Sequence, residues 1–566
     1  MDKLSTIRTS VFFMAIKFVL LSALIKKTIV MTQSKLPTNY GALSTLITVF
    51  FFWGFVAAGN GIFIPFCKSH FHLNQFQSQL IDTSYYGAYF YGSLILYFFS
   101  QASGVDLLNR IGYKKGIVLG LVVSLIGAVL LAFVSTYAGA TFGLVLAAFF
   151  IVALGFSLQQ TAAQPFAIAL GDPSTGSHRL NMAGGINSLG TLLGPIVVSM
   201  VLFGSASGEG KEPTLGNIKT LWLILGGLFA LVALFFTFSK KLPKLNIEEH
   251  IEKSPKASTA LMLIAIPAAI LLFFNNIFTT AQRPYMVVAT LAVTLLILFV
   301  SMAMAKNNKA GWGAMQFPQL VLGMVAIFIY VGVEVTIQSN MGALLKTPEF
   351  GSLDEKFISP YISLYWGSLM IGRWTGAVSV FNLKKSTRQL MTVVVPIAAF
   401  CLILGVNLLK GNKIDNLYYY IICVAVLIAG IFFGQEKPVK TLMTLALLAA
   451  AAMVIGMMTT GTISTYAFMS GGLFCSIMWP CIFSLAVAGL GKYTSEGSSF
   501  LIMMILGGAI IPPMQGALAD TKIGIHTSYF VPVLCFLYLA WHALQTRSVL
   551  KKQGIDYDAE VSGGGH

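Results

Sequence analysis

Amide side chains recur inside apolar stretches of this sequence. Gln160 and Gln164 are four residues apart and share one face of a helix, whereas Gln159 points about 100° away. An amide has two donors and an acceptor, which suits a ligand with several neutral hydroxyl groups. The same groups can bond neighbouring helices instead, so both interpretations stay open. The candidate ligand contacts are Asn60, Gln159, Gln160, Gln164, Asn187, Gln338 and Asn340.

Two acidic residues lie inside apolar runs, where a charge costs about 2.5–3.5 kcal/mol on insertion scales. Glu334 lies four residues before Gln338 and shares its helix face. Asp82 could serve an outer entry site with Thr83 and Ser84, or be a hydrated structural acid. A carboxylate can carry a proton or help bind sodium. Glu334 and Asp82 are therefore candidate cation sites, with Glu334 favoured.

Basic residues near helix ends are candidates for helix caps or gate ion pairs. The three are Arg110, Arg179 and Arg373, and their side chains could also extend to the membrane surface. No metal site is expected, because His70-x-His72 offers too few ligands and the six cysteines have no paired spacing. No nucleophile–base pair or phosphate loop is visible, so an enzyme is not expected.

Composition shows where these residues must lie. The chain has 566 residues, of which 56% are hydrophobic and only 10% charged, whereas soluble domains carry about 25% charged residues. That excludes a soluble protein, a disordered protein and a nucleic-acid-binding protein, despite a net charge of +16. The sequence predicts an all-α polytopic membrane protein, because no alternating strand pattern is present.

Runs of roughly 20 apolar residues each predict a membrane-spanning helix. Sixteen are expected, near 44–66, 80–102, 113–135, 141–170, 184–204, 219–239, 257–275, 284–304, 317–342, 357–380, 389–409, 416–434, 439–458, 461–488, 498–519 and 528–546. Lysines and arginines then fall on one side if the chain starts in the cytoplasm, as the positive-inside rule requires. Both termini are therefore expected in the cytoplasm. Residues 1–30 are interpreted as an interfacial helix or an over-long start, with Met31 as the possible first residue.

An internal repeat sets the architecture. Gln164-Pro165 through Leu189-Gly190 recurs as Trp479-Pro480 through Leu506-Gly507, and Gly54 matches Gly332. Trp479 replaces Gln164 in the second copy and could stack on a ring-shaped ligand. Late matches are about forty residues further apart than early ones, which places an added helix pair in the second half.

The repeat predicts two six-helix bundles plus two added pairs, a design found in secondary transporters. The expected parts are an N-terminal segment 1–40, a first bundle 41–240, a linker with one pair 241–312, a second bundle 313–546 with the other pair near 389–434, and a tail 547–566. Both pairs should lie outside the twelve-helix core, because the repeat is complete without them. The binding site is expected between the bundles.

Several motifs resemble the fucose–hexose permease family of the major facilitator superfamily. They are FFFWGFVAAGN (50–60), NRIGYKK (109–115), QQTAAQPF (159–166), ALGDPSTGSHRLNMAGGINSLG (169–190), YVGVEV (330–335), IGRWTG (371–376) and GSSFLIMMILGGAIIPP (497–513). In the second motif, Asn109 stands where the superfamily usually has an acid. The likeness covers nearly all of residues 40–546 except the added pairs.

The resemblance implies a monomeric inner-membrane importer of a hexose-type sugar such as fucose, glucose or galactose, working by alternating access. It implies coupling to H⁺ or Na⁺, and no cofactor. The two membrane carboxylates of the fucose branch correspond to Gly61 and Gln160 here, so that coupling chemistry does not transfer. An uncoupled facilitator and a transport-dead sugar sensor are the alternatives.

Overall fold

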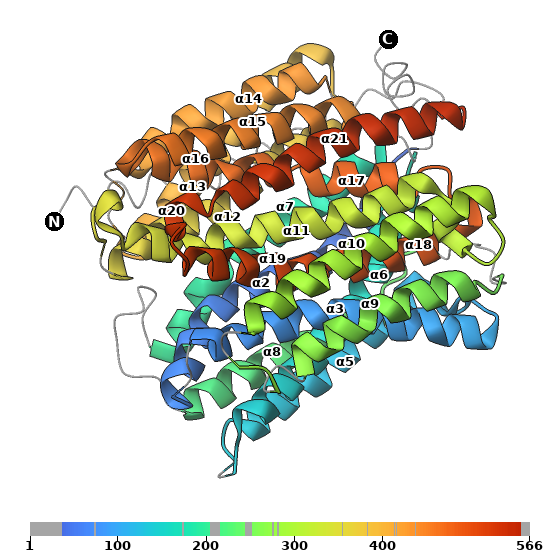
Figure 1. The fold of residues 1–566 in the computed structure, drawn as a ribbon, viewed down its shortest axis with the longest axis horizontal. Helices are drawn as coiled ribbons and strands as arrows, with labels where there is room; N and C mark the ends of the chain where they lie inside the picture. The colour runs from blue at the N-terminus through green and yellow to red at the C-terminus, as the bar shows by residue number, and fades with distance from the viewer. Residues whose placement is uncertain are drawn as a thin grey trace.

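Helices account for every regular element that the structure, a computed structural model, describes (Figure 1). The described residues are 37–72, 75–137, 139–172, 175–203, 215–243, 252–273, 277–279, 282–353, 355–381, 383–412, 414, 416–435 and 437–555. The segment 1–30 and most of the tail lie outside them. Helices suit these apolar runs because each backbone amide and carbonyl is then bonded within its own segment, away from water.

The first half of the chain forms a bundle of antiparallel helices. They are α2 (Tyr40–His70), α3 (Gln75–Ser103), α4 (Leu107–Ile111), α5 (Tyr113–Val134), α6 (Phe142–Ala169), α7 (Gly176–Phe203) and α8 (Leu215–Phe238). Side chains cap two of them: Asp106 accepts from the Asn109 amide before α4, and Thr141 accepts from Leu144 before α6. Helix α5 packs along α6 and α8, and α2 packs along α7.

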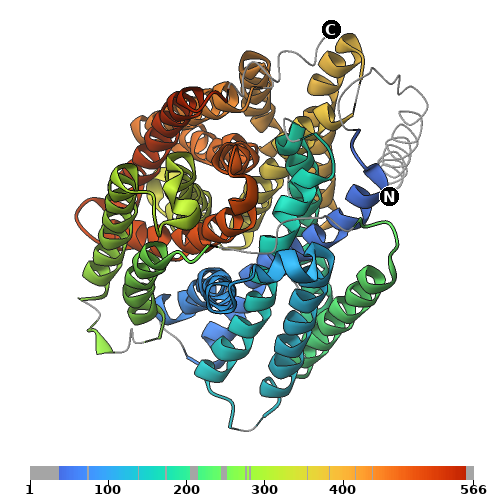
Figure 2. The same cartoon turned by 90° about the vertical axis from the view of Figure 1, so that its right-hand side faces the viewer.

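The second half forms the other bundle, and Figure 2 shows the two side by side. Its helices are α11 (Pro318–Leu345), α12 (Glu355–Ala377), α13 (Lys385–Leu409), α14 (Ile421–Gly434), α15 (Pro438–Met458), α16 (Gly461–Cys475), α17 (Met478–Val487), α18 (Thr494–Met503), α19 (Gly507–Ala519), α20 (Gly524–Thr527) and α21 (Phe530–Lys552). Helix α15 packs on α16 and α21, as α5 packs on α6 and α8. We therefore assign α13 and α14 to the added pair.

The other added pair, α9 (Pro255–Phe273) and α10 (Arg283–Asn307), lies where the halves meet. Helix α9 packs on α3 of the first half, and α10 packs on α11 and α19 of the second. Only 39% of the most apolar window in α9 and 28% of that in α10 is buried, so the pair faces outward rather than separating the bundles. Helices α13 and α14 pack against α12, α15 and α16.

Fourteen of the described helical segments, rather than sixteen, are long and apolar enough to cross a membrane. The two exceptions are α3 and α12, which form helices of 29 and 23 residues close to the predicted positions. Tyrosines, serines and other polar residues lower their hydropathy, and both helices pack within the bundles. The all-α polytopic fold is confirmed.

The repeat is visible in how closely two helix pairs approach. A Cβ at Gly190 of α7 would overlap the Phe51 carbonyl of α2, and a Cβ at Gly507 of α19 would overlap the Phe328 carbonyl of α11. These glycines are matched in the sequence repeat. Small residues at such crossings let helix backbones touch, which is how helices associate in lipid.

Candidate functional site

Helix α11 and the α16–α17 segment form the centre of the second bundle, since 94% of the most apolar window in each is buried. Two residues near mid-helix in α11, Glu334 and Gln338, are nevertheless partly exposed, and so is Trp479 at the start of α17. Trp479 lies against Tyr330, with ring centroids 6.0 Å apart, and stacks on Phe483 at 6.2 Å. Polar and aromatic groups at the centre of this bundle thus keep partly exposed surface.

An ion pair joins the carboxylate of Glu334 to the guanidinium of Arg373 on α12. Arg373 Nη2 lies 3.2 Å from Glu334 Oε1, and the two side chains are only 11% and 12% exposed. The Tyr330 hydroxyl donates to the same carboxylate oxygen at 2.9 Å. The sequence placed Arg373 near a helix end and did not predict this partner, although a buried arginine requires one.

Arg373 also connects the two halves of the molecule. Its Nη1 donates to the Ser188 hydroxyl of α7 at 2.9 Å, and its Nε donates to the Ser476 carbonyl at 3.2 Å. Ser476 lies where α16 ends and α17 has not yet begun. A change in the charge of Glu334 would therefore alter the hydrogen bonds that Arg373 makes at the interface between the halves and at the break in the α16–α17 segment.

Three predicted amides bond other groups of the protein. Gln159 is fully buried; it accepts from Trp53 Nε1 at 2.9 Å and donates to Ser124 at 3.2 Å. Asn187 donates to the Phe50 carbonyl at 2.9 Å, and Asn340 donates to the carbonyl of Thr336, one turn earlier, at 2.9 Å. The contacts of Gln159 and Asn187 favour the interpretation that these two amides hold helices together, whereas the bonds of Asn340 stay within α11.

The other described amides remain available to a ligand. Gln160 is partly exposed and donates to the Tyr89 hydroxyl at 3.1 Å. Gln164 is 5% exposed, and neither it nor Gln338 has a hydrogen-bond partner among the described residues. The side chains of Asn60 and Asp82 lie outside the described part of the structure.

Two predicted arginines have different surroundings. Arg179 is fully buried and donates to the carbonyls of Ala167, Ile168 and Asp172, so it caps the end of α6. Arg110 is exposed in α4, and the structure does not bring it to the interior residues.

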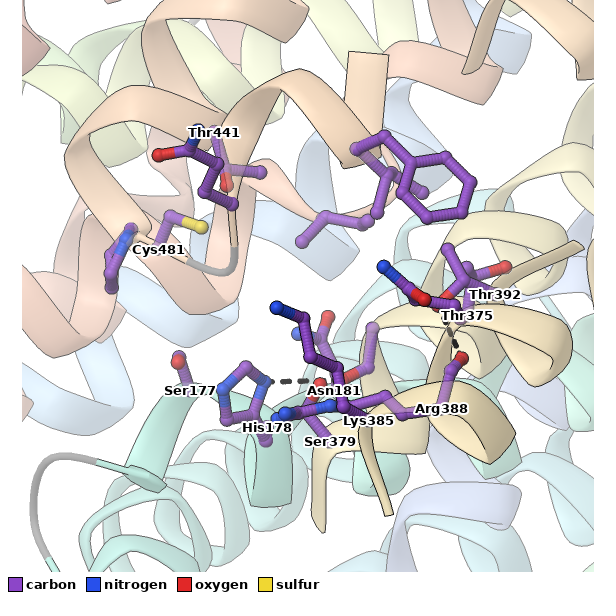
Figure 3. A pocket seen from close by; sticks show the side chains of 17 residues that line it. Ser177, His178, Asn181, Thr375, Ser379, Lys385, Arg388, Thr392, Thr441 and Cys481 are labelled. Carbon is purple, nitrogen blue, oxygen red and sulfur yellow. Dashed lines mark hydrogen bonds between the residues drawn. The ribbon is translucent and has the colours of Figure 1, made fainter. Parts of the chain in front are cut away.

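The halves touch at the face where α7 begins and α12 ends. Lysines and arginines at the starts of α5 and α13 and the ends of α8 and α21 lie on this side, which we name the basic face. Hydrogen bonds that cross between the halves here include His178 Nδ1 to the Gly376 carbonyl at 3.2 Å (Figure 3), Trp374 Nε1 to the Gly185 carbonyl at 3.1 Å, and Tyr40 to the Val380 carbonyl at 2.9 Å. These bonds join the two halves at the basic face.

One acidic residue at this face was missed by the sequence reasoning. Asp106 lies three residues before Asn109, caps α4, and bonds Ser495 of α18 in the second half. Burial raises the pKa of its carboxyl above the usual range, although hydrogen bonds from Asn109, Ser495 and Leu108 partly offset this. The sequence signal was an aspartate at an N-cap position, directly beside the loop motif whose usual acid is absent.

Comparison with known proteins decides the family. The model of the Major Facilitator Superfamily matches residues 42–436. The chain belongs to the major facilitator superfamily. It is 30% identical over 514 residues to a glucose/galactose transporter of Brucella abortus, covering 91% of this chain and 96% of that protein. The predicted family resemblance is confirmed.

A second relative and a solved structure are also similar to this chain. The L-fucose-proton symporter of Escherichia coli K12 is 25% identical, over 87% of this chain and 90% of that one. The crystal structure of FucP in its outward conformation has a TM-score of 0.58 at 22% identity, with 89% of this chain and 98% of that chain covered, and shows the shared fold. Gln160 of α6 and Glu334 and Gln338 of α11 are partly exposed.

Proposed function

We propose that this chain imports a hexose-type sugar by alternating access, coupled to a proton or sodium gradient. The observation that carries the proposal is the Glu334–Arg373 ion pair, which joins a mid-membrane carboxylate to Ser188 in the other half. The names of the two relatives, a glucose/galactose transporter and an L-fucose-proton symporter, support the sugar class.

Sugar contacts are assigned to side chains that combine polarity with partial exposure. Gln160, Gln164 and Gln338 supply donors and acceptors for hydroxyl groups, and Trp479 supplies a ring that can stack on the apolar face of a pyranose. Asn60 keeps its predicted role. Gln159 and Asn187 act by holding the surrounding helices in register, and Asn340 bonds within α11.

Coupling is assigned to Glu334, with Asp82 as the second candidate. Ionised Glu334 holds Arg373, which in turn bonds α7 and the break between α16 and α17. Neutralisation by a proton, or sodium binding at the carboxylate, weakens that attraction and frees Arg373 to change partners. The cation thereby biases the contacts between the halves, as coupling requires.

The basic face is assigned to the cytoplasm by the positive-inside rule, with both termini there and the chain in the inner membrane. The hydrogen bonds between the halves at this face support assigning the structure to a state closed to the cytoplasm. We propose a monomer with no cofactor and no enzymatic activity, whose partners are the sugar and the lipid bilayer. Arg110, Arg179 and Arg373 remain gate candidates, although the contacts of Arg179 are those of a helix cap.

The test is transport by purified protein in proteoliposomes. Counterflow against fucose, glucose, galactose, mannose and N-acetylglucosamine identifies the substrate, and accumulation with an imposed proton or sodium gradient identifies the cation. Counterflow without accumulation under either gradient would establish an uncoupled facilitator. Sugar binding without counterflow would establish a sensor.

A further inference from the structure

His526 joins separate parts of the second half at the face opposite the basic face. It lies in α20, on the turn between α19 and α21, and α21 runs from this turn to the basic face. Its Nδ1 lies 3.1 Å from Oε2 of Glu349, which belongs to a short helical turn, Pro348–Phe350, that follows α11. Its Nε2 lies 2.9 Å from the carbonyl oxygen of Gly456, in the last turn of α15.

Both oxygens that face the imidazole ring of His526 are hydrogen-bond acceptors. A backbone carbonyl carries no proton, and the Gly456 carbonyl also accepts from the Ser464 hydroxyl. The Glu349 side chain is 58% exposed, so hydration supports its negative charge, and an ionised carboxylate only accepts. A neutral imidazole has one N–H and one bare nitrogen, and would set a lone pair against one of the two oxygens. The doubly protonated ring donates to both.

Aromatic packing holds the ring of His526 in this orientation. Phe350 and Phe468 lie edge-to-face with the imidazole, with ring centroids 5.2 Å and 5.8 Å away. A Cβ at Gly456 would lie 2.5 Å from the Phe468 ring, so glycine lets the end of α15 approach this cluster closely. The His526 side chain is only 19% exposed as a result. Water therefore has limited access to replace either hydrogen bond.

The residues that follow His526 connect the same turn to the middle of α11. Tyr529 donates to the carbonyl of Ile337 in α11 at 3.0 Å. Ser528 accepts from Gln515 of α19 at 3.1 Å. The turn thus bonds α11 and α19 directly, and His526 adds the end of α15 and the segment after α11. A charge on one imidazole therefore acts on an attachment that several helices share.

We propose that His526 is a proton-binding site and that the structure represents its charged form. When the neutral ring binds a proton from water, it gains a donor for the second oxygen and a positive charge beside Glu349. When it releases that proton, one oxygen faces a bare nitrogen and the attachment weakens. The site is separate from Glu334, and the proposal does not depend on sugar transport.

The expected pH dependence follows from this proton. Histidine side chains change charge between about pH 5 and 8. Because the folded protein favours the charged ring, the attachment contributes stability at acidic pH and loses it as the pH rises. Among the described residues, Glu349 is the charged group in contact with the ring. Asp520 and Lys522, on the turn before α20, are exposed.

The direct test is solid-state NMR of the full-length protein in nanodiscs, isotope-labelled at the histidine nitrogens. A bare ring nitrogen and a protonated one have distinct chemical shifts, and the His526 signals are identified by their loss in His526→Gln. At pH 6 both nitrogens of His526 should be protonated. At pH 7, Glu349→Gln keeps an acceptor oxygen but removes the charge, and should lower the charged fraction of His526 by about twofold or more. A bare nitrogen in most molecules at pH 6, or an unchanged fraction in Glu349→Gln, overturns the proposal.

Thermal unfolding of the detergent-solubilised protein provides the second measurement. Glutamine at position 526 keeps an N–H for the Gly456 carbonyl but cannot gain a charge. Wild type should therefore melt above His526→Gln by about 1–3 °C at pH 5.5, and the difference should shrink by pH 8. Lys522→Gln removes an exposed positive charge from the same turn and is the control, for which no such pH-dependent difference is expected. A difference between wild type and His526→Gln that is the same at both pH values contradicts proton binding at His526.

Discussion

Glu334 and Arg373 lie 3.2 Å apart on neighbouring helices, and the arginine simultaneously bonds Ser188 in the opposite half of the molecule. Glu334 is thus linked to the interface between the halves through a single residue, Arg373. Glu334→Gln should abolish gradient-driven sugar accumulation in proteoliposomes while gradient-free counterflow is retained. Asp82→Asn tests the second candidate, and accumulation that persists in both variants would contradict coupling at either acid.

Arg373→Gln should lower folding stability by about 3–5 kcal/mol, because it leaves Glu334 buried without its partner. Combining it with Glu334→Gln should recover much of that loss, since no unpaired charge then remains. Detergent-solubilised protein followed by intrinsic fluorescence during denaturant unfolding gives both values. Equal stability of the single and double variants would show that the pair is energetically unimportant.

Gln160 and Gln159 are adjacent and provide a matched pair. Gln160→Ala should weaken sugar binding by more than about 1 kcal/mol, since a buried sugar hydroxyl would lose its partner. Gln159→Ala should instead lower thermal stability and leave sugar affinity largely unchanged, because its bonds go to Trp53 and Ser124. Calorimetric titration and thermal unfolding of both variants separate the roles. Unchanged sugar affinity in Gln160→Ala would instead indicate that this amide serves only helix packing.

Gly507→Ala should destabilise the second bundle by about 1–3 kcal/mol, the typical cost of overpacking. The added methyl group would overlap the Phe328 carbonyl, which belongs to the backbone and cannot rotate away. Gly516→Ala in the same helix is the control, because its nearest neighbour would be Asn340 Oδ1 at 3.8 Å. The difference in melting temperature is the measurement, and equal values would argue against close backbone contact at Gly507.

Asp106→Asn should raise stability at pH 8, with the gain shrinking as the pH falls toward 4. Burial raises the pKa of Asp106 in the folded protein, so the ionised carboxylate destabilises the fold above that pKa, and protonation relieves this at lower pH. Asparagine keeps the N-cap of α4, whereas Asp106→Ala should lose about 1 kcal/mol from the missing cap. Melting temperatures across this pH range test the trend. A gain that does not depend on pH would contradict it.

The sequence predicted the helices well because long apolar runs and turn residues are local signals. Helices α9 and α10 were predicted at 257–275 and 284–304 and lie at Pro255–Phe273 and Arg283–Asn307. The repeat also located Gly190 and Gly507 as equivalent, and both sit at tight helix crossings. Helices α3 and α12 were recognised as helices despite their polar residues.

Side-chain partners could not be predicted, because they depend on how each helix is rotated about its axis. Gln159 and Gln160 have the same chemistry, and only the packing of α6 decides that Gln159 meets Trp53. The Glu334–Arg373 pair joins two helices whose relative rotation no local pattern determines.

The helices added at the seam constrain how the molecule can open. Ser254, just before α9, is fixed by several hydrogen bonds. Its amide donates to Gln101 of α3, its hydroxyl donates to Glu496 of α18, and it also bonds Tyr97 of α3. Because α9 packs on one half and α10 on the other, we expect the two halves to stay connected along this edge, which then acts as a hinge. We expect the two halves to separate mainly along the opposite edge, where α7 packs on α12.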